Sequence, residues 1–165
     1  MAQIIKPPHA YGSGYSVFLA GSIEMGVADN WQVRVERALS DLDIIIYNPR
    51  RDDWDSSWEQ SIENPQFRQQ VEWELGALEC ADIIALYFDP TTKSPISLLE
   101  LGLFCVPLQV VWRQKIIVCC PTGYWRKGNV DIVCQRYRIR QKESLEELVD
   151  GVVKRCAHAA AGTLA

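Results

Sequence analysis

Histidine is scarce in this chain of 165 residues, which contains only His9 and His158. No CxxC pair is present either, because the six cysteines lie at scattered positions in apolar segments: Cys80, Cys105, Cys119, Cys120, Cys134 and Cys156. Zinc sites and Cys/His dyads need such ligands at short, regular spacing. The sequence therefore predicts no metal site, and we expect the cysteines to be buried free thiols that pack as small apolar side chains.

An excess of positive charge is also lacking. The chain has 17 Lys+Arg against 21 Asp+Glu, a net charge of −4, which argues against a nucleic-acid or anionic membrane partner. No apolar run approaches the roughly 20 residues of a membrane-spanning helix, and residues 1–16 lack the pattern of a secretory signal. We expect a cytoplasmic protein that binds a small neutral or cationic ligand.

Neither of the common glycine-rich nucleotide motifs, GxGxxG or GxxxxGK[ST], occurs in the chain. A dinucleotide or triphosphate site is therefore not expected, and no cofactor is predicted. The turn formed by Gly21, Ser22 and Ile23 still offers backbone N–H groups and a hydroxyl to a ligand oxygen. The alternative interpretation is an ordinary turn between a strand and a helix.

Short apolar runs alternate with helical patterns along the chain. Strands are expected at residues 15–20, 43–47, 82–88 and 115–120, with a charged edge strand within residues 136–142. Helices are expected after Asp29 or Asn30, from Pro65 behind Asn64, around Glu100, and after a capping box at Ser144–Glu147. This order predicts a single-domain, doubly wound α/β fold of the flavodoxin or Rossmann type, with a parallel sheet of about five strands flanked by helices. The domain should span residues 15–158, between an N-terminal extension (1–14) and a frayed tail (159–165).

Candidate site residues follow the predicted strands, whose carboxyl ends meet at one edge of a parallel sheet. Asp89, Ser94 and Ser97 follow the third strand, and Asn129 follows the fourth. Glu100 stands out because it lies in an apolar helical turn, where a carboxylate is either partnered or functional.

A long polar segment, residues 48–64, follows the second predicted strand. Loops of this length in compact domains are often functional, so it could form a lid or a substrate wall. Its two arginines form either a solvated turn with Asp52 and Asp53 or a contact with an anionic substrate group. Trp54 either stacks on a base or belongs to the core or an interface.

Three segments, in this order, resemble the nucleoside 2-deoxyribosyltransferase family, which includes relatives that hydrolyse 2′-deoxynucleoside 5′-monophosphates. They are FLAGSI at residues 18–23, ADII at 81–84, and the stretch from Ser94 to the ELG at 100–102, with a weaker match at 128–131. The resemblance implies an enzyme that cleaves an N-glycosidic bond and passes the deoxyribosyl group to a second base or to water through a glutamyl ester.

The resemblance also implies roles for individual residues. Glu100 would be the nucleophile, and Asp82 would hold a sugar hydroxyl or orient the base. Asn129 would be lent across a subunit interface to the 5′ end of the sugar, which implies a homodimer or a larger homo-oligomer with shared active sites. The substrate-binding residues expected on these grounds are Phe18, Gly21, Ser22, Ile23, Asp52, Trp54, Asp89, Ser94, Ser97 and Asn129.

Several positions depart from the family pattern and leave the substrate open. Ser94 stands where the transferases carry an aspartate, as in the monophosphate hydrolases, and would suit a phosphate. Glu24 stands where those hydrolases have an arginine and would repel a phosphate, while Phe18 replaces a tyrosine. Asp89, Asp52 and Asp53 are the acids available to the leaving base. A catalytically silent nucleotide- or sugar-phosphate-binding module is the alternative function, and a flavin-binding protein is a third.

Overall fold

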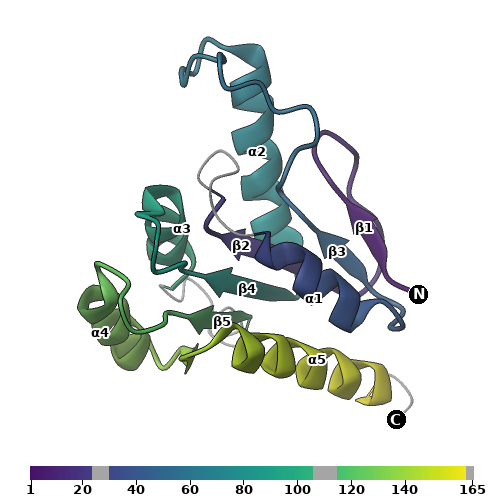
Figure 1. Ribbon diagram of the computed structural model, residues 1–165. Coiled ribbons are helices and arrows are strands. Elements are labelled where there is room, and N and C mark those ends of the chain that lie inside the picture. The colour runs from purple at the N-terminus through teal and green to yellow at the C-terminus, as the bar shows by residue number, and fades with distance from the viewer. Residues whose placement is uncertain (24–29, 106–114, 163–165) are drawn as a thin grey trace.

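Six parallel strands form one sheet in the computed structural model, which describes residues 1–23, 30–105 and 115–162 (Figure 1). The strands are β1 (Gln3–Ile5), β2 (Ser16–Gly21), β3 (Ile45–Tyr47), β4 (Ile83–Tyr87), β5 (Ile116–Cys119) and β6 (Arg140–Lys142). Their order across the sheet is β1-β3-β2-β4-β5-β6. The predicted parallel α/β fold is confirmed, with one strand more than expected, because part of the segment 1–14 pairs with β3 as β1.

Helices cover both faces of the sheet. The α1 helix (Trp31–Leu39) and α5 (Leu145–Gly162) pack on one face, and α2 (Pro65–Cys80), α3 (Pro95–Cys105) and α4 (Lys127–Tyr137) pack on the other. Side chains of β2 alternate between the two cores, with Val17 and Leu19 facing α1 and α5 while Phe18 and Ala20 face the other layer. This is why the strands are nearly continuous apolar runs in the sequence.

The helix starts follow the predicted capping residues in part. The side chain of Asn64 accepts hydrogen bonds from the backbone N–H groups of Gln66 and Phe67 at 3.1 and 3.0 Å, and Pro65 occupies the first turn of α2. Asn30 occupies the N-cap position of α1, but its side chain makes no capping bond, and Asp29 lies outside the described residues. A buried face rather than a cap therefore defines the start of α1.

The C-terminal part of the chain differs from the prediction. Residues 127–137 form α4, which ends at Arg138 in the left-handed conformation (φ 55°), so only residues 140–142 of the expected edge strand are a strand. The α5 helix begins behind Ser144, whose Oγ accepts from the backbone N–H of Glu147 at 3.2 Å. It continues to Gly162, so residues 159–162 extend the helix where a frayed tail was expected, and residues 163–165 lie outside the described part.

The cysteines are free thiols. Five of them are buried, as predicted: Cys105, Cys119, Cys120, Cys134 and Cys156. The prediction is wrong for Cys80, which is exposed because it occupies the last position of α2, where the helix leaves the core.

The strand order reverses between β2 and β4, which places the usual ligand-binding crevice of an open α/β sheet beyond their carboxyl ends. Gly21 ends β2 with φ +138°, and a Cβ there would lie 2.3 Å from the carbonyl oxygen of Tyr87 in β4. The absence of a side chain allows the two strand ends to approach, and the backbone N–H of Ser22 donates to the same carbonyl at 3.0 Å. The chain therefore needs glycine at the switch point itself.

Candidate active site

Glu100 is a buried carboxyl on α3, a helix that stands beyond the carboxyl ends of β2 and β4 (Figure 1). Only 8% of the residue is exposed. Burial and, to a smaller extent, the negative charge of Glu74 together raise the pKa of Glu100 to about 8. A carboxyl held in this way changes its protonation near neutral pH.

Glu74, on α2, is the second carboxyl of the site. The residue is partly exposed, but burial around its carboxyl raises the pKa of Glu74 to about 7, against the hydrogen bond from Gln70, which lowers it. Two interacting carboxyls in a region of low polarity do not readily ionise together, so the pair retains at least one proton at neutral pH. An ionised and a protonated carboxyl side by side can act as nucleophile and acid.

Gln70 connects this pair to the loop that follows β3. Its amide Nε2 donates to Glu74 Oε1 at 2.7 Å and to the carbonyl oxygen of Pro49 at 2.9 Å. Asn48 stabilises the same loop, because its side chain accepts from the backbone N–H of Arg50 at 2.9 Å and donates to Glu36 at 2.6 Å. The start of the long loop is therefore fixed between α1 and α2.

Three buried hydroxyls form a cluster where β2 and β4 end. Thr92 Oγ1 lies 2.9 Å from Ser22 Oγ and 2.7 Å from Ser94 Oγ, and the two serine hydroxyls are themselves hydrogen-bonded. The backbone N–H of Asp89 donates to Ser22 Oγ at 2.9 Å. The cluster links the turn after β2 to the loop after β4.

Ser94 immediately precedes α3 and has a positive φ of 46°, which is rare for a residue with a side chain. The loop around it is held from the segment between β5 and α4, because the carbonyl oxygen of Lys93 accepts from Tyr124 Oη at 2.7 Å and from Trp125 Nε1 at 3.0 Å. Strained backbone of this kind persists where the surroundings over-determine it. The loop thus sets the start of the helix that carries Glu100.

The structure brings several predicted site residues together. Ser22 and Ser94 share the hydroxyl cluster, and partly buried Ile23 follows Ser22. Asp89 is 6% exposed, and its carboxylate accepts from the backbone N–H and the hydroxyl of Thr91 at 2.8 and 2.7 Å. Ser97 is buried one helical turn before Glu100.

Asp82 is not brought together with Glu100. It precedes β4, where its carboxylate accepts from the backbone N–H and the hydroxyl of Ser16 at 2.8 and 3.1 Å. The five residues of β4 separate it from the opposite edge of the sheet, a span of about 17 Å at about 3.3 Å per residue. Asp82 therefore joins the amino ends of β2 and β4, and the catalytic role expected for it does not fit this position.

Three more predicted residues lie apart from the carboxyl pair. Phe18 is fully buried in the core, with its ring 6.5 Å from that of Trp73. Asp52 forms an exposed ion pair with Lys6 at 2.6 Å. Asn129 is exposed near the start of α4. Phe18 has no surface to offer a substrate, and Asp52 is an acid in solvent.

Trp54 lies within an aromatic group on the long loop. Its ring centroid is 5.2 Å from that of Trp58, and the Arg51 guanidinium lies 5.1 Å from the centroid of Trp58 on the same loop. Trp54 Nε1 is buried without a hydrogen-bond partner. Arg51 also donates to Gln69 at 3.3 Å, so this group packs on α2 one residue from Gln70.

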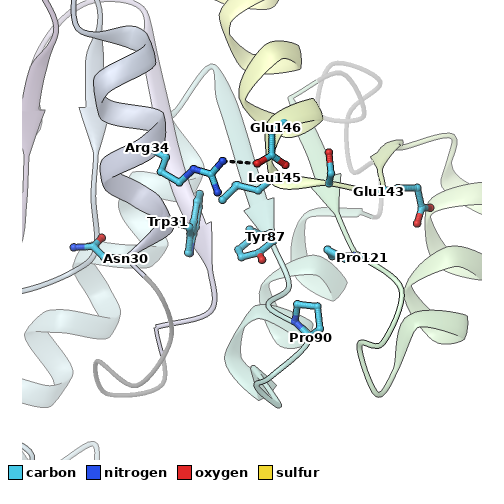
Figure 2. Close-up of a pocket in the computed structure, with 10 residues that line it drawn as sticks. Asn30, Trp31, Arg34, Tyr87, Pro90, Pro121, Glu143, Leu145 and Glu146 are labelled. Carbon is cyan, nitrogen blue, oxygen red and sulfur yellow. Dashed lines mark hydrogen bonds and ion pairs between the residues drawn. The ribbon is translucent and has the colours of Figure 1, made fainter.

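A cavity of about 430 Å³ lies on the other face of the sheet, between α1 and the start of α5 (Figure 2). The rings of Trp31 and Tyr87 lie 5.4 Å apart in its wall, and an ion pair between Arg34 and Glu146 crosses its edge. None of the predicted site residues lines this cavity. The carboxyl pair belongs to the α2 and α3 layer instead.

Within residues 1–23, 30–105 and 115–162, no three His, Cys, Asp or Glu side chains gather in a group that could hold a metal ion. None of the helices in that part of the chain has the length and apolar character needed to cross a bilayer.

Comparison with known proteins decides the family. The sequence profile described as "Nucleoside 2-deoxyribosyltransferase like" matches residues 14–124, which include both carboxyls and the hydroxyl cluster. The chain belongs to the nucleoside 2-deoxyribosyltransferase-like family. No curated protein sequence matches it.

The fold of this family member is similar to the crystal structure of a conserved protein from Enterococcus faecalis V583. The TM-score is 0.58 at 12% sequence identity, over 87% of this chain and 99% of the other. At this identity the likeness concerns the fold alone. The family match itself ends at residue 124, so Asn129 lies beyond it.

Glu74 and Gln70 are candidate site residues that the sequence alone did not indicate. Each lies in a helix with several other polar residues, and nothing in the local pattern distinguishes Glu74 from Glu72 or Glu79. The one available signal is position: with Asn64 as N-cap, Gln70 and Glu74 fall one turn apart on the face that also carries buried Ala77.

Proposed function

We propose that this member of the nucleoside 2-deoxyribosyltransferase-like family cleaves the N-glycosidic bond of a nucleoside or nucleotide, and transfers the deoxyribosyl group to a second base or to water through an ester on Glu100. The observation that carries the proposal is the pair of interacting carboxyls on two helices, Glu100 on α3 and Glu74 on α2, both with raised pKa values. Family membership supports a nucleoside as the substrate class.

In the first step a carboxylate oxygen of Glu100 attacks the anomeric carbon of the sugar. The bond between that carbon and the base breaks, its electron pair goes to the base nitrogen, and Glu74 donates a proton to the base. The product is a glycosyl ester on Glu100 and an ionised Glu74. Water or a second base then attacks the anomeric carbon and loses a proton to Glu74, while the bond from that carbon to the Glu100 oxygen breaks and its electron pair returns to the Glu100 carboxylate.

This mechanism requires the proton of the pair to reside on Glu74 when the bond breaks. Without a substrate Glu100 has the higher pKa, about 8 against about 7 for Glu74. A bound substrate changes this order, because the positive charge that develops on the sugar stabilises an ionised Glu100, and the negative charge that develops on the base stabilises a protonated Glu74. The opposite assignment, with Glu74 as nucleophile, predicts an ester on Glu74.

The hydroxyl cluster of Ser22, Thr92 and Ser94 lies near the start of α3, where we propose that it binds the polar 5′ end of the substrate. Hydroxyls can donate to a sugar 5′-hydroxyl or to a 5′-phosphate. We therefore include 5′-monophosphates among the substrates to be compared. Ser94→Ala removes one of these hydroxyls. If the cluster binds the phosphate, this variant should lower turnover of 5′-monophosphates more than that of nucleosides, and if it binds the 5′-hydroxyl, the reverse is expected.

A second copy of the chain is the partner we propose for the outer face of α3. The sequence of α3 is apolar on all sides, and its outward residues are largely exposed: Ile96 at 58%, Leu99 at 58% and Leu103 at 50%. An apolar helix of this kind is normally covered. Exposed Asn129, on neighbouring α4, would then reach the sugar of the partner subunit's site.

The test is a panel of deoxyribonucleosides and their 5′-monophosphates, with and without a second free base, followed by chromatography of the released bases. Glu100→Gln and Glu74→Gln are the variants, and Glu63→Gln, at an exposed position, is the matched control. Trapping with a 2′-fluoro-arabinosyl nucleoside and peptide mass spectrometry identifies the esterified glutamate.

Each outcome has a distinct meaning. Base exchange lost only in the two site variants establishes a transferase, and base release without exchange establishes a hydrolase. An ester on Glu74 would reverse the roles of the two carboxyls. Ligand binding without any Glu100-dependent product would support the alternative, a silent nucleotide- or sugar-phosphate-binding module.

A further inference from the structure

The amide of Gln70 contains a buried hydrogen-bond acceptor that the fold leaves unused. Gln70 is 5% exposed on α2, one helical turn before Glu74. Its Nε2 makes two bonds, to Glu74 Oε1 at 2.7 Å and to the carbonyl oxygen of Pro49 at 2.9 Å. Its Oε1 is buried without a hydrogen-bond partner.

The orientation of this amide is fixed by its neighbours. A backbone carbonyl oxygen can only accept, so the amide nitrogen must face Pro49. A flipped amide would place Oε1 against the Pro49 carbonyl oxygen and would break both existing bonds. The two N–H groups are committed, and Oε1 is left as an acceptor beside the carboxyl of Glu74. Buried acceptors are normally satisfied, so this one indicates a donor supplied by a ligand.

We propose, on the basis of the function above, that Gln70 reads the leaving base: its Oε1 accepts a hydrogen bond from an exocyclic amino group, while the carboxyl of Glu74 donates to the neighbouring ring nitrogen. Side chains four residues apart lie on one face of a helix, about 5–6 Å apart at Cβ. Their ends can therefore meet two adjacent atoms of one base edge.

The pattern selects among bases. Adenine presents an amino donor beside a ring-nitrogen acceptor, and cytosine does the same with its amino group and N3. Guanine and hypoxanthine present two acceptors, O6 and N7, on the edge that adenine uses, and their O6 would face Gln70 Oε1. Uracil places its donor and acceptor in the reverse order to cytosine. On these edges of the bases the pattern therefore selects a nucleoside or nucleotide of adenine or cytosine.

The experiment compares kcat/KM for deoxyadenosine against deoxyinosine and for deoxycytidine against deoxyuridine. The wild type is expected to prefer the amino base of one pair or both by about 10- to 100-fold. Gln70→Leu should reduce that preference to within about threefold, and Gln66→Leu, at an exposed position of the same helix, should leave it unchanged. The pair that shows the preference distinguishes adenine from cytosine.

A purely structural role for Gln70 would lower turnover of all four substrates in proportion and leave the ratios unchanged, and that result would overturn the inference. A wild type without a preference for either amino base would do the same, even if Gln70→Leu failed to fold. Calorimetry with free adenine and hypoxanthine separates this inference from the reaction. If the protein shows no turnover but binds adenine more tightly than hypoxanthine, and Gln70→Leu abolishes that difference, the base recognition by Gln70 stands. Only the proposed reaction would then be refuted.

Discussion

Replacing Glu100 by glutamine should stabilise the protein at alkaline pH and not at acid pH. The pKa of Glu100 lies near 8 in the folded chain, against an ordinary value of 4.5. Below about pH 4.5 both folded and unfolded chains carry the proton, so the carboxyl costs nothing. Between 4.5 and 8 only the folded chain retains it, and stability falls as the pH rises. Above pH 8 the folded chain carries the full cost of a buried charge.

The size of the effect follows from that difference. About 3.5 pH units at about 1.4 kcal/mol each give about 5 kcal/mol as an upper bound. Part of this comes from the charge of Glu74, which the variant also relieves, and the buried amide of the new glutamine costs about 1–3 kcal/mol if it finds no partner. We expect Glu100→Gln to be more stable than the wild type by about 2–4 kcal/mol at pH 8.5, and no more stable at pH 4.

Thermal unfolding followed by circular dichroism at pH 4, 6 and 8.5 measures this difference. For a domain of this length, about 2–4 kcal/mol corresponds to a rise of roughly 5–15 °C in Tm. Glu63→Gln serves as the control for a lost surface charge. Equal Tm values for Glu100→Gln and wild type at pH 8.5, with parallel curves down to pH 4, would refute the claim that Glu100 is buried as an uncompensated acid.

Three further predictions concern the acid, the switch point and the subunit contact. Glu74→Gln should lower kcat by about 100-fold or more and shift the pH dependence of kcat/KM to lower pH, because the nucleophile loses a charged neighbour; an unaltered pH–rate profile would exclude Glu74 as the acid. Gly21→Ala should cost at least 2 kcal/mol in urea unfolding, since its Cβ would meet the β4 backbone, whereas Gly128→Ala, with no atom within 4 Å, should be neutral or slightly stabilising. Leu99→Asp should convert an oligomer to monomers in analytical ultracentrifugation, and Ile62→Asp, at another exposed apolar position, should not; monomeric wild type would contradict the contact.

The fold was accessible from the sequence because each central strand is buried on both faces. Continuous apolar runs such as residues 83–87 carry that signal directly. The strands that the apolar pattern did not predict correctly are the two short edge strands. In β1 only Ile5 of three residues is buried, and in β6 no residue is fully buried. Edge strands are defined by pairing with a neighbour, and pairing between distant segments leaves no local pattern.

The candidate site was only partly accessible, for a similar reason. Glu100 could be selected as a candidate because a carboxylate in an apolar helix is locally unusual, and its burial agrees with that pattern. Asp82 was misplaced because a carboxylate that begins a strand has the same local pattern whether it binds a ligand or joins two strand ends. Glu74 was missed because its role depends on how α2 packs beside α3, and a polar helix contains several equivalent glutamates.

The two carboxyls come from different helices, and this explains why the fold cannot relieve the unfavourable free energy of placing them close together. Glu74 and Glu100 project from two different helices that pack on one sheet, so their mutual repulsion cannot be relieved by the movement of a single loop. Gln70 further restrains Glu74 through the Pro49 carbonyl. The raised pKa values reflect the free energy needed to hold two acids close together. A positive charge developing at the anomeric centre of a sugar would instead favour an ionised carboxyl and offset that free energy. Under the proposed function, such a site would bind the transition state more tightly than the ground state, which is the requirement for catalysis.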